Sequence, residues 1–540
     1  MTLDYAPAPL PDDVRRRYLR YGYQSDALIP TYLARNRDEF GPLSAVIDGG
    51  VELTWAELVD AATRFAGFLV GRGIGPGDVV TWQLPNWWQS LVAAYGIWAA
   101  GAISNPVVEI YREHELRRIV EPLRPRAVVT AAEFRGCAHA AMWSEVCREV
   151  GWTPDVHVVL RGSAAGWTPF DDTLTARPHL ASRLEPDDPA LVVLTSGTTS
   201  GSKAVVHSTR SYLSYPVRTV RWFAYGWDDR SYSPMSLGHV GGLTFGVAIP
   251  LFTGGSTVLA DHWDAEAAVD AIVGHGVTYT GGAAVFAQEL LEVVRSRGLG
   301  GLPLPRGYTC GASPFTPALA EAAEAAGLQP TRAYGMTECP TVSGTAIFDD
   351  RDIRVYSDGL IAPGCEIRVV DTDQRDLAPG QVGELVVRGP HRALGYLDAA
   401  DTREGFDDEG WFRSGDLGLL DERGAVKVTG RLKEIINRGG EKISAREIEE
   451  ALGACPAVLE AAVVAVPHQR LGEQPAAFVL LRPGATTEVA ELTAFLRASG
   501  LAGQKIPAVW RFVDELPRTA SGKVKKYVLQ DQLTDGAAPG

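Results

Sequence analysis

Short apolar segments alternate with longer alanine-rich segments between residues 54 and 297. The apolar segments have the length of β-strands, and the alanine-rich ones have the length and period of amphipathic helices. This alternation is typical of parallel βαβ units, whose helices cover both faces of a sheet. The sequence therefore predicts a doubly wound α/β body. The expected strands are residues 78–83, 127–130, 156–160, 256–260 and 277–280, and the expected helices are residues 89–100, 265–275 and 286–297.

The segment before this body has two parts. The first forty-odd residues are rich in arginine and tyrosine and show no clear period, so they are interpreted as an arm packed on the main body. Residues 54–57 (TWAE) have the capping-box pattern, in which the first and fourth side chains bond to backbone N–H groups of the first helical turn. We expect a helix to begin there and to end near Gly71.

The sequence changes in texture after Thr341. Short apolar runs separated by Pro-Gly and Gly-Pro pairs then predict a β-rich subdomain over residues 354–389. A charged turn follows at residues 430–434, and beyond it lies a compact α+β unit. We expect an N-terminal domain over 1–430, a hinge at 431–433 and a C-terminal domain over 434–540. Within the last domain we expect a second capping box at 444–447, strands at 461–466 and 476–481, and a helix at 489–498.

Composition and charge exclude several classes of protein. The chain has 540 residues, which is too long for one core, and its net charge of −15 argues against a surface that binds nucleic acid. Its longest apolar run, residues 91–103, is too short to cross a bilayer, and its N-terminus lacks a secretory signal pattern. The six cysteines are scattered and form neither a metal-binding nor a disulfide pattern. We expect a cytoplasmic protein with reduced cysteines.

The continuous apolar segment at residues 189–194 predicts a strand buried on both faces. A loop rich in glycine and hydroxyl groups follows it directly. Glycines let the loop backbone approach a polyanion, hydroxyl groups donate hydrogen bonds and the lysine adds a point charge. The loop lacks the spacing of a Walker A motif, and its alternative interpretation is a flexible linker. Its candidate phosphate-binding residues are Thr195, Ser196, Gly197, Thr198, Thr199 and Lys203.

Five stretches in this order and spacing resemble the motifs of the adenylate-forming superfamily, which includes acyl-CoA synthetases, aryl-acid and nonribosomal adenylation enzymes, and beetle luciferases. The stretches are residues 195–203, 333–338, 411–416, 430–443 and 517–523. The resemblance implies a large ATP- and acid-binding domain followed by a small, mobile catalytic lid domain. The phosphate loop departs from the usual T-S-G-T-T-G-x-P-K-G, because Ser200, Ser202 and Ala204 replace its glycine, proline and last glycine.

The resemblance implies a role for each residue of a nucleotide site. Tyr334 offers a flat face to adenine, Thr337 a donor to the α-phosphate, and Glu338 an oxygen ligand to Mg²⁺. Asp416 would accept the ribose hydroxyl groups, and Arg431 would contact ribose or phosphate. The alternatives are ordinary structural roles, namely a core tyrosine, a loop carboxylate, a turn aspartate and a surface arginine. The remaining expected nucleotide-binding residues are Gly311, Ala312, Ser313 and Gly335.

Lys523 is the expected catalytic lysine, since a lysine in such a terminal Ser-Gly-Lys tail enters the active site of family members during adenylation. Fixed positive charge there would stabilise the attack of a carboxylate on an anionic α-phosphate. Thr337, Glu338 and His239 complete the expected catalytic set. The alternative is a simple basic tail, and this is our interpretation of the neighbouring Lys525 and Lys526.

The second half-reaction of the family needs a different surface. The resemblance implies that the small domain rotates about Lys433 and presents Gly439 and Gly440 to the adenylate. A glycine pair leaves room for the thin thiol arm of CoA or of a carrier-protein phosphopantetheine. These three residues are therefore counted with the cofactor-binding set.

The expected acid pocket contains His239, which aligns with the residue that flanks the substrate carboxylate in the family; its alternative is a satisfied core histidine. Val240 stands where amino-acid-activating members carry aspartate and dihydroxybenzoate-activating members often carry asparagine. Small residues at 281–284 and 310–313 leave room in the pocket, and no cation is placed to hold a second carboxylate. An aryl, cinnamate-like, alicyclic or medium acyl acid is therefore favoured.

These residues favour an ATP- and Mg²⁺-dependent acid–thiol ligase whose acceptor is CoA or an acyl carrier protein. One alternative is an adenylate-forming enzyme that passes an acid or another oxyacid to a nitrogen acceptor, and another is an inactive scaffold homologue. The motifs alone do not distinguish an acid ligase from a luciferase-type oxygenase. Homodimerisation is a habit of the family that the sequence does not show.

Overall fold

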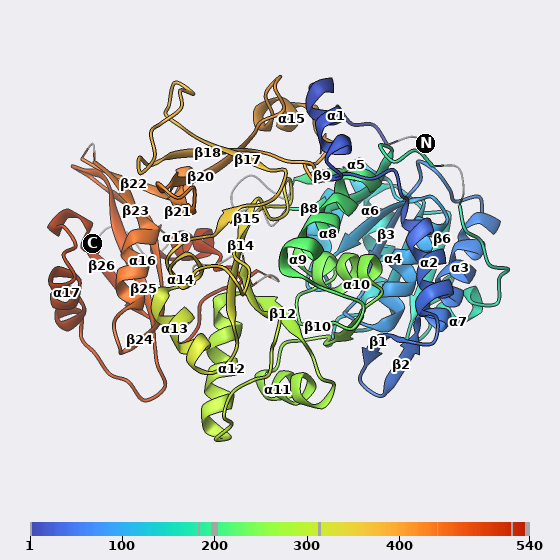
Figure 1. Cartoon of the computed structure of the whole chain (residues 1–540), viewed down its shortest axis with the longest axis horizontal. Helices are drawn as coiled ribbons and strands as arrows, with labels where there is room; N and C mark the ends of the chain where they lie inside the picture. Colours follow the sequence, from blue (N-terminus) through green and yellow to red (C-terminus); the bar gives the residue numbers. More distant parts are fainter. Residues whose placement is uncertain are drawn as a thin grey trace.

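The computed structural model describes residues 3–181, 184–195, 203–311, 315–439, 441–519 and 522–534. They form a mixed α/β structure with a large N-terminal and a small C-terminal domain, as the sequence predicts. The C-terminal domain lies at one end of the long axis of the molecule, and the N-terminus lies toward the other end (Figure 1). The predicted hinge residues fall at the end of β21 (Val426–Arg431) and in the 3₁₀ turn η2 (Leu432–Glu434). Their role in domain movement and the exact domain bounds stay predictions.

One sheet in the described part of the chain has eight strands in the order β19-β9-β8-β4-β3-β5-β6-β7. It is parallel from β8 to β7, whereas β8, β9 and β19 pair antiparallel. Residues of β3, β4 and β5 are buried throughout, as expected for parallel strands with both faces covered. The strands are β3 (Val79–Gln83), β4 (Ile103–Val107), β5 (Ala127–Ala131), β6 (Val156–Leu160), β7 (Thr168–Pro169), β8 (Pro189–Leu194), β9 (Ala204–Ser208) and β19 (Gly395–Tyr396).

A second sheet has nine strands in the order β16-β15-β14-β13-β12-β10-β11-β1-β2. Its central strands, β14 through β1, run parallel, so the carboxyl ends of β12, β13 and β14 share one edge, where ligands bind in open α/β sheets. The strands are β1 (Ser44–Asp48), β2 (Val51–Thr54), β10 (Arg230–Ser233), β11 (Ser256–Leu259), β12 (Tyr279–Gly282), β13 (Gly307–Gly311), β14 (Pro330–Tyr334), β15 (Ser343–Gly344) and β16 (Leu360–Ile361).

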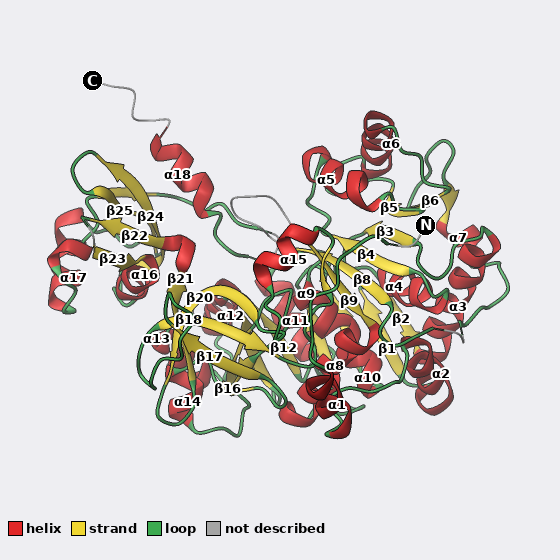
Figure 2. Ribbon diagram, turned by 90° about the horizontal axis from the view of Figure 1, so that it is seen from above, coloured by secondary structure: helices red, strands yellow, loops and turns green. Residues whose placement is uncertain are grey.

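Helices cover these sheets (Figure 2). The predicted capping box is confirmed, since the Thr54 hydroxyl accepts from the N–H of Glu57, whose carboxylate accepts from the N–H of Thr54. The helices are α2 (Ile29–Phe40), α3 (Trp55–Gly71), α4 (Trp88–Ala99), α5 (Glu113–Leu123), α6 (His139–Val150), α7 (Phe170–Thr173), α8 (Thr209–Phe223), α9 (Val240–Gly242), the π-helix η1 (Leu243–Ala248), α10 (Ile249–Thr253), α11 (Ala265–Gly274), α12 (Ala284–Ser296) and α13 (Pro317–Ala325).

The N-terminal arm is more regular than its sequence indicates. It contains α1 (Asp12–Arg20) and runs into α2. Of the residues of α1, Val14 and Tyr18 are buried. A single buried i, i+4 pair does not produce a recognisable helical period in the sequence, so this helix was not predicted.

A β-rich subdomain is present as a four-stranded antiparallel sheet in the order β17-β18-β20-β21, but it extends beyond the predicted range of 354–389, since β20 and β21 lie after residue 389. Its members are β17 (Glu366–Val370), β18 (Gly383–Arg388), β20 (Phe412–Leu420) and β21, with α14 (Arg351–Tyr356) before it and α15 (Ala399–Gly405) within it. The subdomain leads directly into the predicted hinge through β21.

The C-terminal domain pairs β23, β22, β25 and β24 in that order, with β26 beside β25. The second capping box is only half formed: the Ser444 hydroxyl accepts from the N–H of Glu447, but the Glu447 carboxylate pairs with Lys505. The elements are β22 (Ile435–Arg438), β23 (Glu441–Ser444), α16 (Ala445–Gly453), β24 (Val458–His468), β25 (Gly472–Leu481), α17 (Val489–Ala498), the 3₁₀ turn η3 (Gly503–Lys505), β26 (Val509–Phe512) and α18 (Lys526–Thr534).

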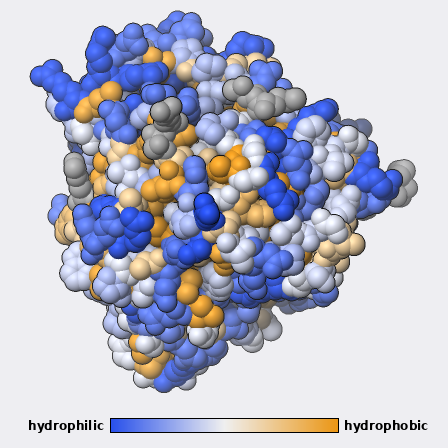
Figure 3. All heavy atoms as spheres, turned by 90° about the vertical axis from the view of Figure 1, so that its right-hand side faces the viewer, coloured by the Kyte–Doolittle hydropathy of each residue, from blue (hydrophilic) through white to orange (hydrophobic). Residues whose placement is uncertain are grey.

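The surface carries both polar and apolar side chains. On the face drawn in Figure 3, apolar groups are interspersed with polar ones instead of forming a continuous belt. Among the helices of the described residues, none has both the length and the apolar character that a bilayer span requires.

Candidate active site

The phosphate loop connects two antiparallel strands, β8 and β9. Its base is closed because the N–H of Thr195 donates to the carbonyl oxygen of Lys203 and the N–H of Lys203 donates to the Thr195 hydroxyl, each across 2.9 Å. Ser196, Gly197, Thr198 and Thr199, predicted to bind phosphate, lie outside the described residues, as do the unusual Ser200 and Ser202. The loop therefore leaves and re-enters the sheet at one closed point.

Lys203 lies beside the predicted Mg²⁺ ligand. Its Nζ is 2.9 Å from Oδ1 of Asp401 on α15 and 5.1 Å from the ring centre of Tyr396. The Tyr396 hydroxyl donates a hydrogen bond to the Glu338 carboxylate. Burial raises the pKa of Glu338, while the bond from Tyr396 and the charge of Lys203 act in the opposite direction. Tyr396 was not predicted, because a lone tyrosine 58 residues from Glu338 carries no motif.

A hydrogen-bonded triad connects the predicted adenine and ribose residues. The hydroxyl of Tyr334, the last residue of β14, donates to Oδ2 of Asp416 across 2.9 Å. Arg431 Nε lies 2.9 Å from Oδ1 of the same carboxylate. Asp416 is only 5% exposed, so its charge is held between the tyrosine and the guanidinium. The three predicted residues therefore lie together, although 97 positions separate the first from the last.

The segment after β14 is packed tightly. A side chain on Gly335 would place its Cβ 2.1 Å from the backbone nitrogen of Thr341, so glycine is required there. Thr337 is buried, and its carbonyl oxygen lies 2.8 Å from Nε2 of His207 on β9. Burial lowers the pKa of His207 to about 4, which keeps the ring neutral. His207 was not predicted as a site residue, since a buried histidine in an apolar strand has no distinctive sequence pattern.

Lys523 reaches this site from the C-terminal domain. It lines the same cavity as Tyr334, Asp416 and Arg431. Burial lowers the pKa of Lys523 to about 8, with Arg431 adding to the effect and the carboxylates opposing it. A Cβ on the preceding Gly522 would lie 3.0 Å from Cβ of Ala283, so the tail touches the end of β12. The predicted catalytic lysine and the predicted nucleotide residues are thus brought together.

His239 lies close to Lys523 as well. Its Nδ1 accepts a hydrogen bond of 3.2 Å from the N–H of Gly241, so the ring proton is on Nε2. Burial, and after it the charge of Lys523, lowers the pKa of His239 to about 4. The ring is therefore neutral at neutral pH and a donor through Nε2. The helix that follows it includes the π-helical turn η1, a form frequent at functional sites.

The other predicted residues divide into two groups. Gly311 ends β13 next to Tyr334's strand, whereas Ala312 and Ser313 lie outside the described residues. Lys433 and Gly439 are exposed, and neither is among the described residues that line the cavity; Gly440 is not described. Among the described residues, Lys523 therefore lines the cavity beside the predicted nucleotide residues, and Gly439 does not.

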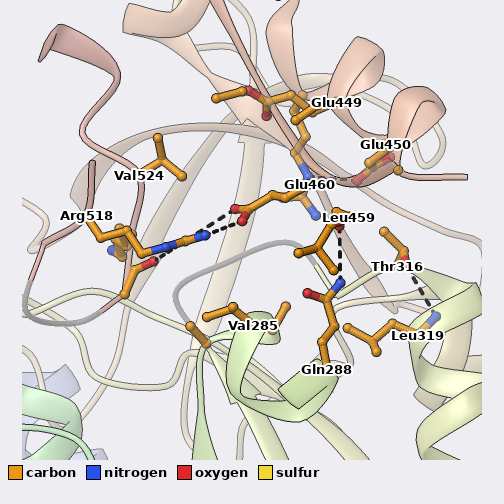
Figure 4. A pocket seen from close by; sticks show the side chains of 18 of the residues that line it. Val285, Gln288, Thr316, Leu319, Glu449, Glu450, Leu459, Glu460, Arg518 and Val524 are labelled. Atoms are coloured by element: carbon orange, nitrogen blue, oxygen red, sulfur yellow. Dashed lines mark hydrogen bonds and ion pairs between the residues drawn. The ribbon is translucent and has the colours of Figure 1, made fainter. Parts of the chain in front are cut away.

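The cavity between the domains has a volume of about 370 Å³. It is lined by Ala333, Tyr334, Gly335 and Lys523, together with residues of α12 and α13 in the N-terminal domain and of α16 and β24 in the C-terminal domain. Figure 4 shows part of this lining, where Gln288 reaches toward the backbone of Leu459 across the domain boundary. Among the described residues, no three histidine, cysteine or acidic side chains are arranged to hold a metal ion by themselves.

Two family models match the chain: "AMP-binding enzyme" over residues 33–397 and "AMP-binding enzyme C-terminal domain" over residues 447–523. The chain belongs to the AMP-binding enzyme family. The resemblance to the adenylate-forming superfamily is therefore confirmed, and with it membership among ATP-binding, AMP-forming ligases. The first model covers both large sheets, and the second runs from within α16 to Lys523.

Relatives of known activity in this family align with nearly the whole chain. A medium-chain fatty-acid–CoA ligase of Escherichia coli K12 is 30% identical over 96% of this chain and 93% of its own length. A salicylyl-CoA synthase/salicylate adenylyltransferase of a Streptomyces species is 32% identical over 97% of both chains.

Solved structures of the family share the fold. The ATP-bound MatB of Rhodopseudomonas palustris superposes with a TM-score of 0.83 at 29% identity, covering 94% of this chain and 100% of that one. The amide bond synthetase McbA of Marinactinospora thermotolerans superposes with a TM-score of 0.81 at 26% identity, covering 93% and 99%. The family thus includes acid–thiol ligases and an amide-forming enzyme, and the coarse activity of this chain is adenylate-forming acid ligation.

Proposed function

We propose that this enzyme uses ATP and Mg²⁺ to convert a carboxylic acid into an acyl-adenylate and then transfers the acyl group to the thiol of CoA or of a carrier-protein phosphopantetheine. The observation that carries the proposal is the position of Lys523 in one cavity with Tyr334, Asp416 and Arg431. In adenylation a carboxylate oxygen attacks the α-phosphorus of ATP and pyrophosphate leaves. The reaction gathers negative charge at one point, where a buried ammonium group acts most strongly.

The residues around the cavity divide this work. Tyr334 and Asp416 bind the nucleoside, Arg431 neutralises Asp416 and contacts ribose or phosphate, and Lys203 meets the β,γ-end of ATP. Glu338 suits Mg²⁺, which prefers one or two carboxylates plus substrate phosphates to an all-protein cage. When bound, the ion neutralises phosphate charge. Thr337 donates to the α-phosphate, and Gly311 and Gly335 leave space for the nucleotide; the nucleotide role of Ala312 and Ser313 is carried by sequence alone.

The acid is proposed to be aryl, cinnamate-like, alicyclic or medium acyl. His239 is neutral, so it can donate from Nε2 to the substrate carboxylate without adding charge beside Lys523. Val240 presents an apolar side chain where it follows His239. The salicylate and medium-chain fatty-acid relatives support both aryl and alkyl acids.

A second candidate function is transfer to a nitrogen acceptor. It is favoured by the likeness to an amide bond synthetase at 26% identity. Both candidates share the first half-reaction and differ only in the acceptor.

Acid-dependent exchange of labelled pyrophosphate into ATP tests the first half-reaction. A panel of benzoates, cinnamates, alicyclic acids and straight-chain acids is expected to contain an acid that supports exchange. No exchange with any acid contradicts the proposal. AMP release is then measured with CoA, with an alkylamine and with neither. Faster AMP release with CoA supports the thiol ligase. Faster AMP release with the amine and not with CoA supports the second candidate, transfer to a nitrogen acceptor.

A further inference from the structure

The tail that carries Lys523 forms a short hairpin turn. The N–H of Gly522 donates to the carbonyl oxygen of Thr519 across 2.9 Å, and the N–H of Lys523 donates to the Thr519 hydroxyl across 3.1 Å. One isolated antiparallel bridge, between Arg518 and Val524, pairs the two sides of the turn. The N–H of Thr519 also donates to the carbonyl oxygen of Lys523, and the N–H of Lys525 to that of Pro517, each across 2.7 Å. A single short hairpin is nevertheless marginal by itself, so its position depends on what fastens it to the domain.

On the upstream side the turn is fastened by Arg518. One guanidinium nitrogen donates across 2.9 Å to the carbonyl oxygen of Gly522, the residue before the catalytic lysine. The guanidinium also forms a two-pronged ion pair with Glu460 on β24, as Figure 4 shows. Arg518 therefore connects the backbone at Lys523 directly to the central sheet of the C-terminal domain. A planar fork suits such a double contact better than a lysine does.

On the downstream side the turn is fastened by Lys526, the first residue of α18. Its Nζ forms ion pairs with Glu434 in η2 and, across 2.8 Å, with Glu449 on α16. Burial opposes the charge of Lys526, but the two carboxylates outweigh it and raise its pKa. The interpretation of Lys526 as part of a basic surface tail is therefore wrong. Glu434 directly follows Lys433, so this contact also ties the tail to the segment after the predicted hinge.

We propose that Arg518 and Lys526 are positioning residues that hold the turn of Lys523 at the active site for adenylation. The inference rests on the proposed role of Lys523 and adds the devices that place it. Both residues line the cavity, but their charged groups are paired with Glu460, Glu434 and Glu449, so we assign them no direct role on substrate. Both act through the backbone on each side of the lysine, and they carry the turn with the C-terminal domain as one body. They should therefore matter for the half-reaction that uses Lys523 and not for the one from which Lys523 is absent.

Hydrogen–deuterium exchange of the full chain without substrate tests the fastening itself. Arg518→Gln and Lys526→Met are expected to speed exchange at the amides of Gly522 and Lys523 more than at the amides of β24 and β25. Arg511→Gln, at an exposed position of β26, and Lys525→Met, beside Lys526, are the matched controls and should exchange as the wild type does. Wild-type exchange in both Arg518→Gln and Lys526→Met would overturn the proposal.

The half-reactions supply the second readout. With the best acid of the panel, both variants are expected to lower the maximal rate of pyrophosphate exchange about 10- to 100-fold, the usual effect of a small misplacement. The KM for ATP and the formation of thioester from synthetic acyl-AMP should stay at wild-type values. Arg518→Lys and Lys526→Arg should each recover part of the rate. Equal loss in both half-reactions contradicts the positioning role.

Lys523→Ala is measured in parallel. If Lys523→Ala retains pyrophosphate exchange, the proposed function of Lys523 is wrong. The contacts of Arg518 and Lys526, detected by hydrogen–deuterium exchange, can still be present. If Lys523→Ala is inactive and Arg518→Gln and Lys526→Met are fully active, the positioning proposal alone is refuted.

Discussion

The phenol oxygen of Tyr334 and Oδ2 of Asp416 are joined by a hydrogen bond of 2.9 Å between β14 and β20. Because the other oxygen of Asp416 faces Arg431, one buried carboxylate connects the nine-stranded sheet to the first residue of the predicted hinge. The residues proposed to bind adenine and ribose thus share one network with the predicted hinge. A change in this network should affect ATP binding first.

Asp416→Asn removes the negative charge that both partners need. We expect the KM for ATP to rise about tenfold or more, since a charge-assisted hydrogen bond contributes about 1.5–3 kcal/mol. Tyr334→Phe keeps the aromatic ring, and Asp416 keeps its contact with Arg431, so the KM for ATP should rise less. Pyrophosphate exchange at varied ATP concentration measures both values. A wild-type KM in Asp416→Asn would show that this carboxylate does not bind the nucleotide.

The charge of Lys523 should be visible in the pH profile of adenylation. Its ammonium form is the active one, and burial lowers its pKa to about 8. Activity is therefore present below that pKa and lost as the pH rises through it. Lys523→Arg should be slower but keep its rate to higher pH, because an arginine does not lose its proton. The profile is measured by pyrophosphate exchange between about pH 6 and pH 10. A wild-type rate that stays constant to the upper end contradicts the assignment.

Tyr396 should tune the metal dependence through Glu338. Tyr396→Phe removes the hydrogen bond that opposes the raised pKa of this buried carboxyl, so protons compete better with Mg²⁺. We expect a higher Mg²⁺ concentration for half-maximal exchange, most clearly at acidic pH, and a loss of about 1–3 kcal/mol of stability. Tyr356→Phe is the control, because its hydroxyl makes the same kind of bond to Glu321 on the surface. Equal Mg²⁺ dependence in both variants would contradict the role of Tyr396.

His207 should make the protein sensitive to acid. Its folded-state pKa of about 4 lies below the ordinary value of 6.5, so the unfolded chain binds its proton first. The stability that the neutral ring contributes is complete above the unfolded value and is lost as the pH falls toward 4. The loss is at most about 3 kcal/mol. Urea unfolding at several pH values measures it, and His207→Gln should show a shallower decline. Identical declines would exclude His207 as the cause.

Much of the nucleotide site could be predicted because its residues occur in short contiguous motifs. Tyr334, Gly335, Thr337 and Glu338 follow one strand, and the structure places Tyr334 with Asp416, Arg431 and Lys523 as expected. The helix at residues 55–71 was predictable for the same reason, since a capping box and a helical period are local patterns. The short helix α1 was not, because it buries too few side chains to show a period.

By itself, the sequence determined the family, the mixed α/β class and the approximate positions of several strands, and it singled out Lys523 as the candidate catalytic lysine. Those features depend on residue type and local spacing, which a single chain displays directly. Only the tertiary structure decided that Tyr396 serves Glu338, that His207 supports Thr337, and that Lys526 is an anchor and not a surface charge. Each of these pairs joins residues 58 or more positions apart, and a contact of that kind leaves no period in the sequence. The tertiary structure also decided that Lys523 lies at the cavity, where Gly522 approaches Ala283 so closely that a Cβ on Gly522 would lie 3.0 Å from Cβ of Ala283.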